Sequence, residues 1–166
     1  MKKILIALLL TVSLSAHGAE SFDDGVQALN NLDYAAALRI FTKYAEQGNA
    51  SAQDKLGLMY FVGWGVPEDD KEAVKWFRLA AEQGQTIAQV NLGTLYYRGG
   101  GVPQSYVYAH MWWNIAASDG SDRGAKNRDL IAAKKRDLIA AEMTPDQIAK
   151  AQELARECAK NDYKGC

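Results

Sequence analysis

The sequence predicts an all-α fold, an α-solenoid of about four helix-turn-helix repeats followed by a C-terminal capping helix. Leu56-Gly57 recurs as Leu92-Gly93, and Gly65-Val66-Pro67 recurs as Gly101-Val102-Pro103, in each case 36 residues later. Apolar residues within each unit lie three or four positions apart, which is the spacing of a helix and differs from the alternation of a strand. The same period joins Tyr60 to Tyr96, Ala73 to Ala109, Trp76 to Trp112, Ala80-Ala81 to Ala116-Ala117, and Gly84 to Gly120.

Residues 1–18 are expected to be a secretory signal peptide that is not part of the fold. Lys2 and Lys3 precede a nearly wholly apolar run at 4–14, and small residues lead to an expected cleavage after Gly18. That run is too short to span a bilayer as a mature helix, and no later segment is apolar for long enough. We therefore expect a periplasmic or secreted protein without a membrane anchor after signal removal, in which residues 19–166 form one domain.

The repeat domain is expected to divide into units at about 21–48, 49–84 and 85–120 and a cap at 121–166. In the first unit Asn30-Asn31-Leu32-Asp33 replaces the Gly-rich loop, which predicts a tight turn. In the second unit one helix is expected over Asn49–Val62 and another over about 68–83, because a Gly- and Pro-rich loop separates them. Gly84 then supplies a left-handed stop.

Small residues at fixed positions indicate close helix contacts. Gly57 and Gly93 have no Cβ, so the helices of each pair can approach closely. Trp76 and Trp112 are expected to supply the large apolar area that such contacts need.

An octapeptide is present in tandem in the C-terminal part of the chain. Residues 126–133 recur as 134–141 with seven of eight identical, which predicts an over-long helix from Ser121 to about Glu142. Residues 19–121 carry a net charge of −5 and residues 122–166 a net charge of +2. We interpret the helix as a basic end that meets an acidic surface on a partner or on a second copy; the alternative is a neutral duplication.

The last helix has a clear start and a covering role. Thr144-Pro145-Asp146-Gln147 combines an N-cap, a proline at the first helical position and a capping box. One face is apolar and the other is charged, as a terminal repeat requires. The apolar stripe comprises Ile148, Ala151, Leu154, Ala155 and Cys158.

Cys158 and Cys166 are the only cysteines, and an even count in an exported protein favours a disulfide. On one unbroken helix their Cα atoms would be about 12 Å apart, so a bond requires the chain to turn back between them. Asn161 and Gly165 suit such a turn. Metal binding and thiol chemistry remain as alternatives.

These motifs resemble the Sel-one-like repeat, a relative of the tetratricopeptide repeat with a longer, Gly-rich middle loop. The first copy matches at Leu56-Gly57, Tyr60, Gly63, Gly65-Val66, Ala73, Trp76, Ala80-Ala81 and Gly84. The resemblance covers roughly residues 22–165, and the ending from Met143 to Cys166 looks like that of small exported bacterial members. The resemblance implies a protein–protein interaction module that acts as an adaptor, inhibitor or immunity-type binder.

In tetratricopeptide-like stacks the first helix of each pair lines a concave groove, and here the residues facing it are apolar, aromatic or basic. Aromatic and Arg side chains commonly anchor interfaces. The alternative is that several of these residues are buried between repeats. The predicted partner-binding residues are Leu58, Phe61, Val62, Val90, Thr94, Tyr97, Arg98, Arg123 and Lys126.

The sequence does not provide the parts of an enzyme. After signal removal one histidine remains, His110, and we expect it in or near the core. Neither Ser-x-x-Lys nor Lys-Thr-Gly occurs, and zinc would lack ligands. The alternative, suggested by cysteine-rich relatives within the resemblance, is a cell-envelope or β-lactam hydrolase. We expect no cofactor or metal, another protein as the partner rather than nucleic acid, and a monomer or weak homo-oligomer.

Overall fold

The computed structural model describes residues 20–118 and 125–166, and of residues 125–131 the backbone alone. The signal peptide, Arg123 and the start of the octapeptide helix therefore lie outside what is described. The described part is all-helical, which confirms the predicted fold class. Its helices are α1 (Phe22–Asn30), α2 (Tyr34–Glu46), α3 (Ala50–Val62), α4 (Asp70–Ala81), α5 (Thr86–Arg98), α6 (Tyr106–Ser118), α7 (Ala125–Ala140) and α8 (Pro145–Lys160).

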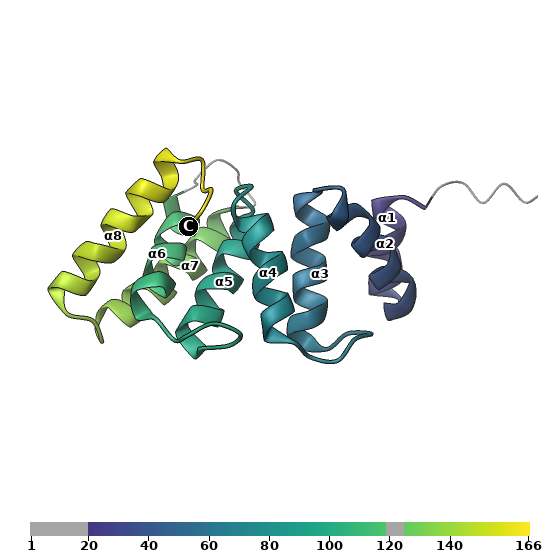
Figure 1. Cartoon of the computed structure of the whole chain (residues 1–166), viewed down its shortest axis with the longest axis horizontal. Helices are drawn as coiled ribbons and strands as arrows, with labels where there is room; N and C mark the ends of the chain where they lie inside the picture. The colour runs from purple at the N-terminus through teal and green to yellow at the C-terminus, as the bar shows by residue number, and fades with distance from the viewer. Residues whose placement is uncertain (1–19, 119–124) are drawn as a thin grey trace, which may run out of the picture.

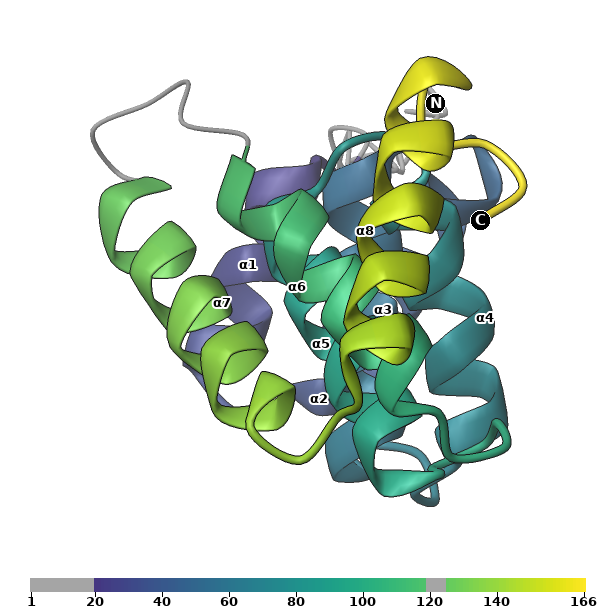
Figure 2. The same ribbon diagram turned by 90° about the vertical axis from the view of Figure 1, so that its left-hand side faces the viewer.

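The helices form consecutive pairs stacked along the long axis of the molecule, from α1 at one end to α8 at the other (Figure 1). Each helix packs against the next as far as α7, and α8 packs against α6. Contacts of α5 with α3 and with α7 join the first helices of successive units. At the end of the stack α7 and α8 lie on opposite sides of α6 (Figure 2). Helices α3, α5 and α7 therefore form one row, as a solenoid requires.

Local sequence signals fix most helix ends. The Thr144 hydroxyl accepts from the Gln147 N–H at 3.3 Å, while the Gln147 side chain accepts from the Thr144 N–H at 2.8 Å, so the predicted capping box at α8 is confirmed. Gly63 ends α3 with a φ of 78°. The second helix of that unit begins later than predicted, at Asp70, because the Asp69 side chain is its N-cap. In the first unit the tight turn is confirmed, with Leu32 at a φ of 63°.

The predicted close contacts are confirmed, and an aromatic ring lies against each glycine. A Cβ added at Gly57 would lie 2.8 Å from the Phe77 ring, and one at Gly93 would lie 2.6 Å from Nε1 of Trp113. The rings on the glycines are therefore those of Phe77 and Trp113, one position after the tryptophans of the repeat motif. Trp112 is fully buried in the core as predicted, whereas Trp76 is only half-buried. One residue along a helix turns a side chain by about 100°, so adjacent rings face different ways.

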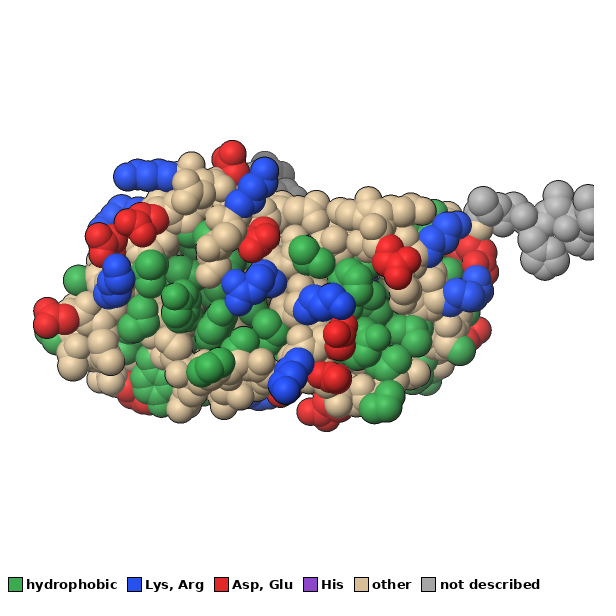
Figure 3. All heavy atoms as spheres, viewed as in Figure 1, with side chains coloured by type: hydrophobic (Ala, Val, Ile, Leu, Met, Phe, Trp, Pro, Cys, Tyr) green, Lys and Arg blue, Asp and Glu red, His purple; other side chains and the backbone are tan. Residues whose placement is uncertain are grey.

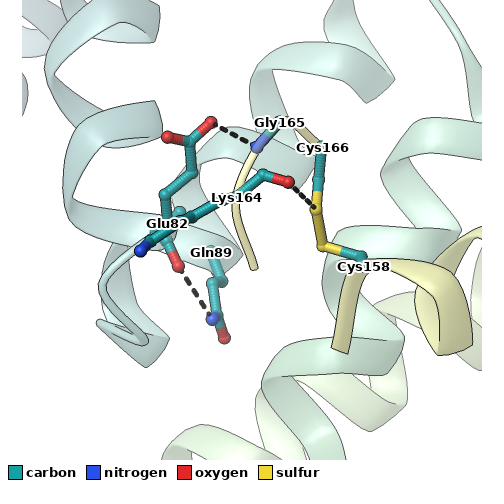
Figure 4. Close-up of a disulfide and its surroundings, with 7 residues drawn as sticks. Glu82, Gln89, Cys158, Lys164, Gly165 and Cys166 are labelled. Atoms are coloured by element: carbon teal, nitrogen blue, oxygen red, sulfur yellow. Dashed lines mark hydrogen bonds between the residues drawn. A yellow bond between two sulfur atoms is a disulfide. The ribbon is translucent and has the colours of Figure 1, made fainter. Parts of the chain in front are cut away.

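The C-terminal residues turn back on α8 and close the predicted disulfide (Figure 4). Cys158 and Cys166 are bonded, with their Cα atoms 5.7 Å apart. The reversal uses left-handed residues at Asp162, Tyr163 and Gly165. The Gly165 N–H donates to the Glu82 carboxylate at 3.3 Å, which ties this end of the chain to the C-terminus of α4.

Candidate protein-binding face

The predicted partner-binding residues on α3 and α5 lie along one side of the row of first helices. We call this surface the inner face; it comprises Leu58, Phe61, Val62, Val90, Thr94, Tyr97, Arg98 and, from α7, Lys135 and Leu138. Arg123 lies outside the described residues, and the side chain of Lys126 is not described. The opposite side, that of α4 and α8, is seen in Figure 3, where charged side chains over α4 separate two groups of hydrophobic ones.

The inner face is part core and part surface. Leu58, Phe61 and Val90 are half-buried and pack against the main hydrophobic cluster, so for them the alternative of burial between repeats is supported. Val62 is 43% exposed and Tyr97 is 36% exposed. The exposed residues lie at the C-terminal ends of α3 and α5, so this is the end of the inner face that a partner can reach.

A small cavity opens between α5, α6 and α7. Its volume is about 80 Å³, and its lining is mostly apolar. Tyr97 forms one wall, with its ring 5.7 Å from that of Tyr106 and 6.0 Å from that of Trp113. Leu138, the most exposed large apolar residue in the described part of the chain at 70%, lies on the α7 side. The full lining is Tyr97, Trp113, Lys135, Leu138, Ile139 and Glu142.

Lys135, which lines this cavity, and Arg98 each lie over an aromatic ring. The Lys135 Nζ is 5.3 Å from the centroid of the Trp113 ring, and the Arg98 guanidinium is 5.9 Å from that of Phe61. Lys135 donates to the Thr94 hydroxyl at 3.3 Å, and that hydroxyl donates to the Val90 carbonyl at 2.9 Å. Burial lowers the pKa of Lys135, and repulsion from Arg98 lowers it further. The ammonium is thus positioned but poorly solvated.

Three of these residues were not identified from the sequence as binding residues. Trp113 is not at a motif position of the repeat, and Lys135 belongs to the duplicated octapeptide. Leu138 was not singled out. Only the contact of α7 with α5 brings Lys135 and Leu138 onto the inner face, and periodicity in one chain does not report such a contact.

Two titratable side chains in the described part of the chain are buried in the core, those of His110 and Asp54. His110 is 3% exposed, as expected for a core histidine, and burial lowers its pKa. Asp54 on α3 is also buried, and its desolvation raises the pKa of that carboxyl group. No group of three His, Cys, Asp or Glu among the described residues could hold a metal ion. None of the described helices is both long and apolar enough to span a bilayer.

Comparison with known proteins identifies the repeat. A family model of the Sel1 repeat matches residues 50–85 and 86–121. A protective antigen of uropathogenic Escherichia coli strains, displaying an SLR fold, aligns with 29% identity and a TM-score of 0.75 over 86% of this chain and 30% of its own. A Sel1 repeat protein from Oxalobacter formigenes aligns with 26% identity and a TM-score of 0.58, over 75% of this chain and 58% of its own. This chain therefore spans less than two thirds of either relative.

A search of the curated proteins found no match. The two solved structures are helical repeat proteins of the same kind, so their likeness supports the solenoid assignment.

Proposed function

We propose that this chain, a Sel1 repeat protein, binds another protein on its inner face as an adaptor, inhibitor or immunity-type partner. Sel1 repeats generally serve protein–protein interaction. The observation that carries the proposal is the cavity between α5, α6 and α7, where Tyr97, Trp113 and the exposed Leu138 surround an apolar space beside a cation. Partly exposed aromatic and basic side chains around a small pocket are typical of the centre of an interface.

Action in the periplasm or outside the cell is part of this proposal. The apolar start of the sequence supports export. The Cys158–Cys166 disulfide is consistent with an oxidising compartment, where such bonds persist.

The second candidate function, a hydrolase of the cell envelope or of β-lactams, finds less support. A hydrolase needs a nucleophile or an activated water beside a base. His110, the single histidine in the described residues, is 3% exposed in α6, and the charges that act on its pKa are those of Arg136 and Asp137. A screen of the purified protein against peptidoglycan and a chromogenic β-lactam is expected to show no turnover, and activity lost in His110→Gln would contradict the proposal.

Site-specific photocrosslinking tests where the partner binds. A photoreactive residue at position 97 on α5 is expected to give one discrete adduct in the cell envelope. The matched control at position 79 uses Leu79, which is 40% exposed on α4, away from the inner face. Equal adducts from both positions, or an adduct from 79 alone, would show that the inner face is not the binding surface.

A further inference from the structure

Several described cations are paired with a carboxylate, whereas Arg98 and Lys135 are close enough for their charges to repel each other. Lys75 pairs with Glu72 at 3.2 Å, Lys150 with Glu153 at 3.2 Å, and Arg136 with Asp137 at 2.7 Å. Neither Arg98 nor Lys135 forms an ion pair with any carboxylate in the described residues. We call these two residues the cation pair.

The one carboxylate that lines the same cavity does not neutralise the cation pair. Glu142 lies against Tyr106, and its charge raises the pKa of the Tyr106 hydroxyl. It lies beyond the C-terminal end of α7, seven residues from Lys135, and forms no ion pair with it. Lys135 and Glu142 thus both line the cavity, and the Glu142 carboxylate interacts with Tyr106.

Lys135 is held in place at a free-energy cost that an anion would remove. Its side chain is half-buried, and the Thr94 hydroxyl at 3.3 Å is a neutral partner. Burial and the neighbouring Arg98 both disfavour the charged ammonium. A carboxylate placed between the two cations would reverse the repulsion and would give charge-assisted hydrogen bonds, which are stronger than neutral ones.

We propose that the cation pair binds an Asp, Glu or C-terminal carboxylate of an acidic segment in the partner protein, while a neighbouring apolar side chain of that segment enters the cavity beside Tyr97 and Leu138. This inference rests on the proposed function and specifies the partner's chemistry. The exposed Val62 and Leu138 extend the apolar surface on either side of the cation pair, so an extended segment can contact all three helices of the row.

A protein segment fits these observations better than a nucleic acid or a membrane. Polyanions are usually bound by a dense stripe of Lys and Arg, whereas the described lining of this cavity contains one cation, Lys135. The formal net charge of the whole chain is −1, which disfavours a polyanionic surface. The adjoining apolar cavity requires an occupant that carries both a carboxylate and a small apolar group.

The test selects ligands from a random-sequence phage-displayed peptide library on the whole protein. Selected peptides are expected to place Asp or Glu beside Leu, Ile, Met or Phe, and to lose binding when the acid is replaced by its amide. Arg98→Met and Lys135→Met are each expected to weaken binding by on the order of tenfold, since each removes a charge-assisted hydrogen bond. Lys75→Met is the matched control, because Lys75 also lies over a ring, that of Trp76, yet is paired with Glu72.

The outcomes separate this inference from the proposed function. Neutral peptides that bind, lose affinity in Tyr97→Ala and are indifferent to Arg98→Met would overturn the cation pair while keeping the binding face. Peptides insensitive to Tyr97→Ala, or none retained at all, would overturn both. Binding of phosphatidylglycerol vesicles that Arg98→Met abolishes would show a membrane instead, and a concentration-dependent dimer abolished by Arg98→Met would show a second copy. Circular dichroism and thermal melts check that every variant is folded.

Discussion

The two matched repeats, α3–α4 and α5–α6, share a scaffold and differ on the inner face. In both, a glycine lies on an aromatic ring, and a glutamine side chain donates to a carbonyl eight residues earlier, at 3.1 Å for Gln53 and 3.2 Å for Gln89. The left-handed glycines that end α3 and α5 have φ values of 78° and 74°. Positions that hold the helix pair together are thus the same in both units.

Positions on the inner face have changed between the two units. Leu58 corresponds to Thr94, Val62 to Arg98, and Phe77 to Trp113, each 36 residues apart. The α5–α6 unit thereby gains a hydroxyl, a cation and an indole N–H, and the Trp113 N–H donates to the Val90 carbonyl at 3.1 Å. The comparison teaches that the repeat motif encodes the scaffold. The residues between motif positions make the α5–α6 unit the polar, basic half of the inner face.

The largest expected effect compares the two close contacts. Gly93→Leu should destabilise the protein by ~3 kcal/mol or more through overpacking, and Gly57→Leu by somewhat less. The difference arises because moving Trp113 also breaks its bond to Val90, whereas Phe77 makes no such bond. Chemical denaturation midpoints measure both changes. Gly84→Asn is the control, since Gly84 is left-handed with open space around it; midpoints equal to the control's would show that the two glycines are not close contacts.

Removing the disulfide should weaken the α5–α6 unit more than the α3–α4 unit. The double variant Cys158→Ser and Cys166→Ser is expected to lose about 2–3 kcal/mol of unfolding free energy by the chain-entropy argument. Hydrogen exchange should rise in α6, on which α8 packs, and stay unchanged in α3. Thiol titration of unreduced, denatured wild type should find no free thiols. Equal exchange changes in α3 and α6, or two free thiols, would contradict this assignment.

Trp113→Phe gives the α5–α6 unit the residue that the α3–α4 unit has at the same position, Phe77. We expect a loss of about 1–2 kcal/mol, because the variant lacks the hydrogen bond to Val90 and offers Lys135 a smaller ring with a weaker cation–π attraction. The matched control is Trp76→Phe, whose buried indole N–H has no hydrogen-bond partner in the structure. Thermal melts compare the two variants, and a larger loss in Trp76→Phe would refute the hydrogen-bond argument.

The smallest expected effect is a pH dependence carried by His110, whose counterpart in the α3–α4 unit is Val74. The folded pKa of His110 lies below its unfolded value, so the fold favours the neutral imidazole. Its contribution to stability is therefore present above about pH 6.5 and is lost as the pH falls toward the folded pKa. His110→Val should flatten the dependence of the melting temperature on pH in this range. Asp54 is present in wild type and in the variant, and its raised pKa gives stability that falls as the pH rises, opposite to the effect of His110. A slope unchanged by His110→Val would exclude His110 as the source of the pH dependence.

Local and periodic signals were enough to predict most of the fold. The capping box at Thr144, the tight turn at Leu32 and the close contacts of Gly57 and Gly93 all depend on residues near in sequence or on helical spacing. The sequence did not distinguish which ring of each adjacent pair meets the glycine, because Trp76 and Phe77 are both apolar. The angle at which the two helices cross decides which of the two rings faces the glycine, and a single helix does not determine that angle.

By itself, the sequence determined that this chain forms paired helices with a 36-residue period, because a helix that buries one stripe repeats its small and large residues at fixed intervals. The turn that brings Cys166 back to Cys158 was also foreseeable, although of Asn161 and Gly165 only Gly165 adopts the left-handed conformation. Only the tertiary structure placed Lys135 and Leu138 of α7 beside Arg98 and Tyr97 of α5. The rotation of a helix about its axis is set by which face packs against its neighbours, and the duplicated octapeptide, which repeats after eight residues rather than a whole number of turns, leaves that rotation undecided until α7 packs against α6.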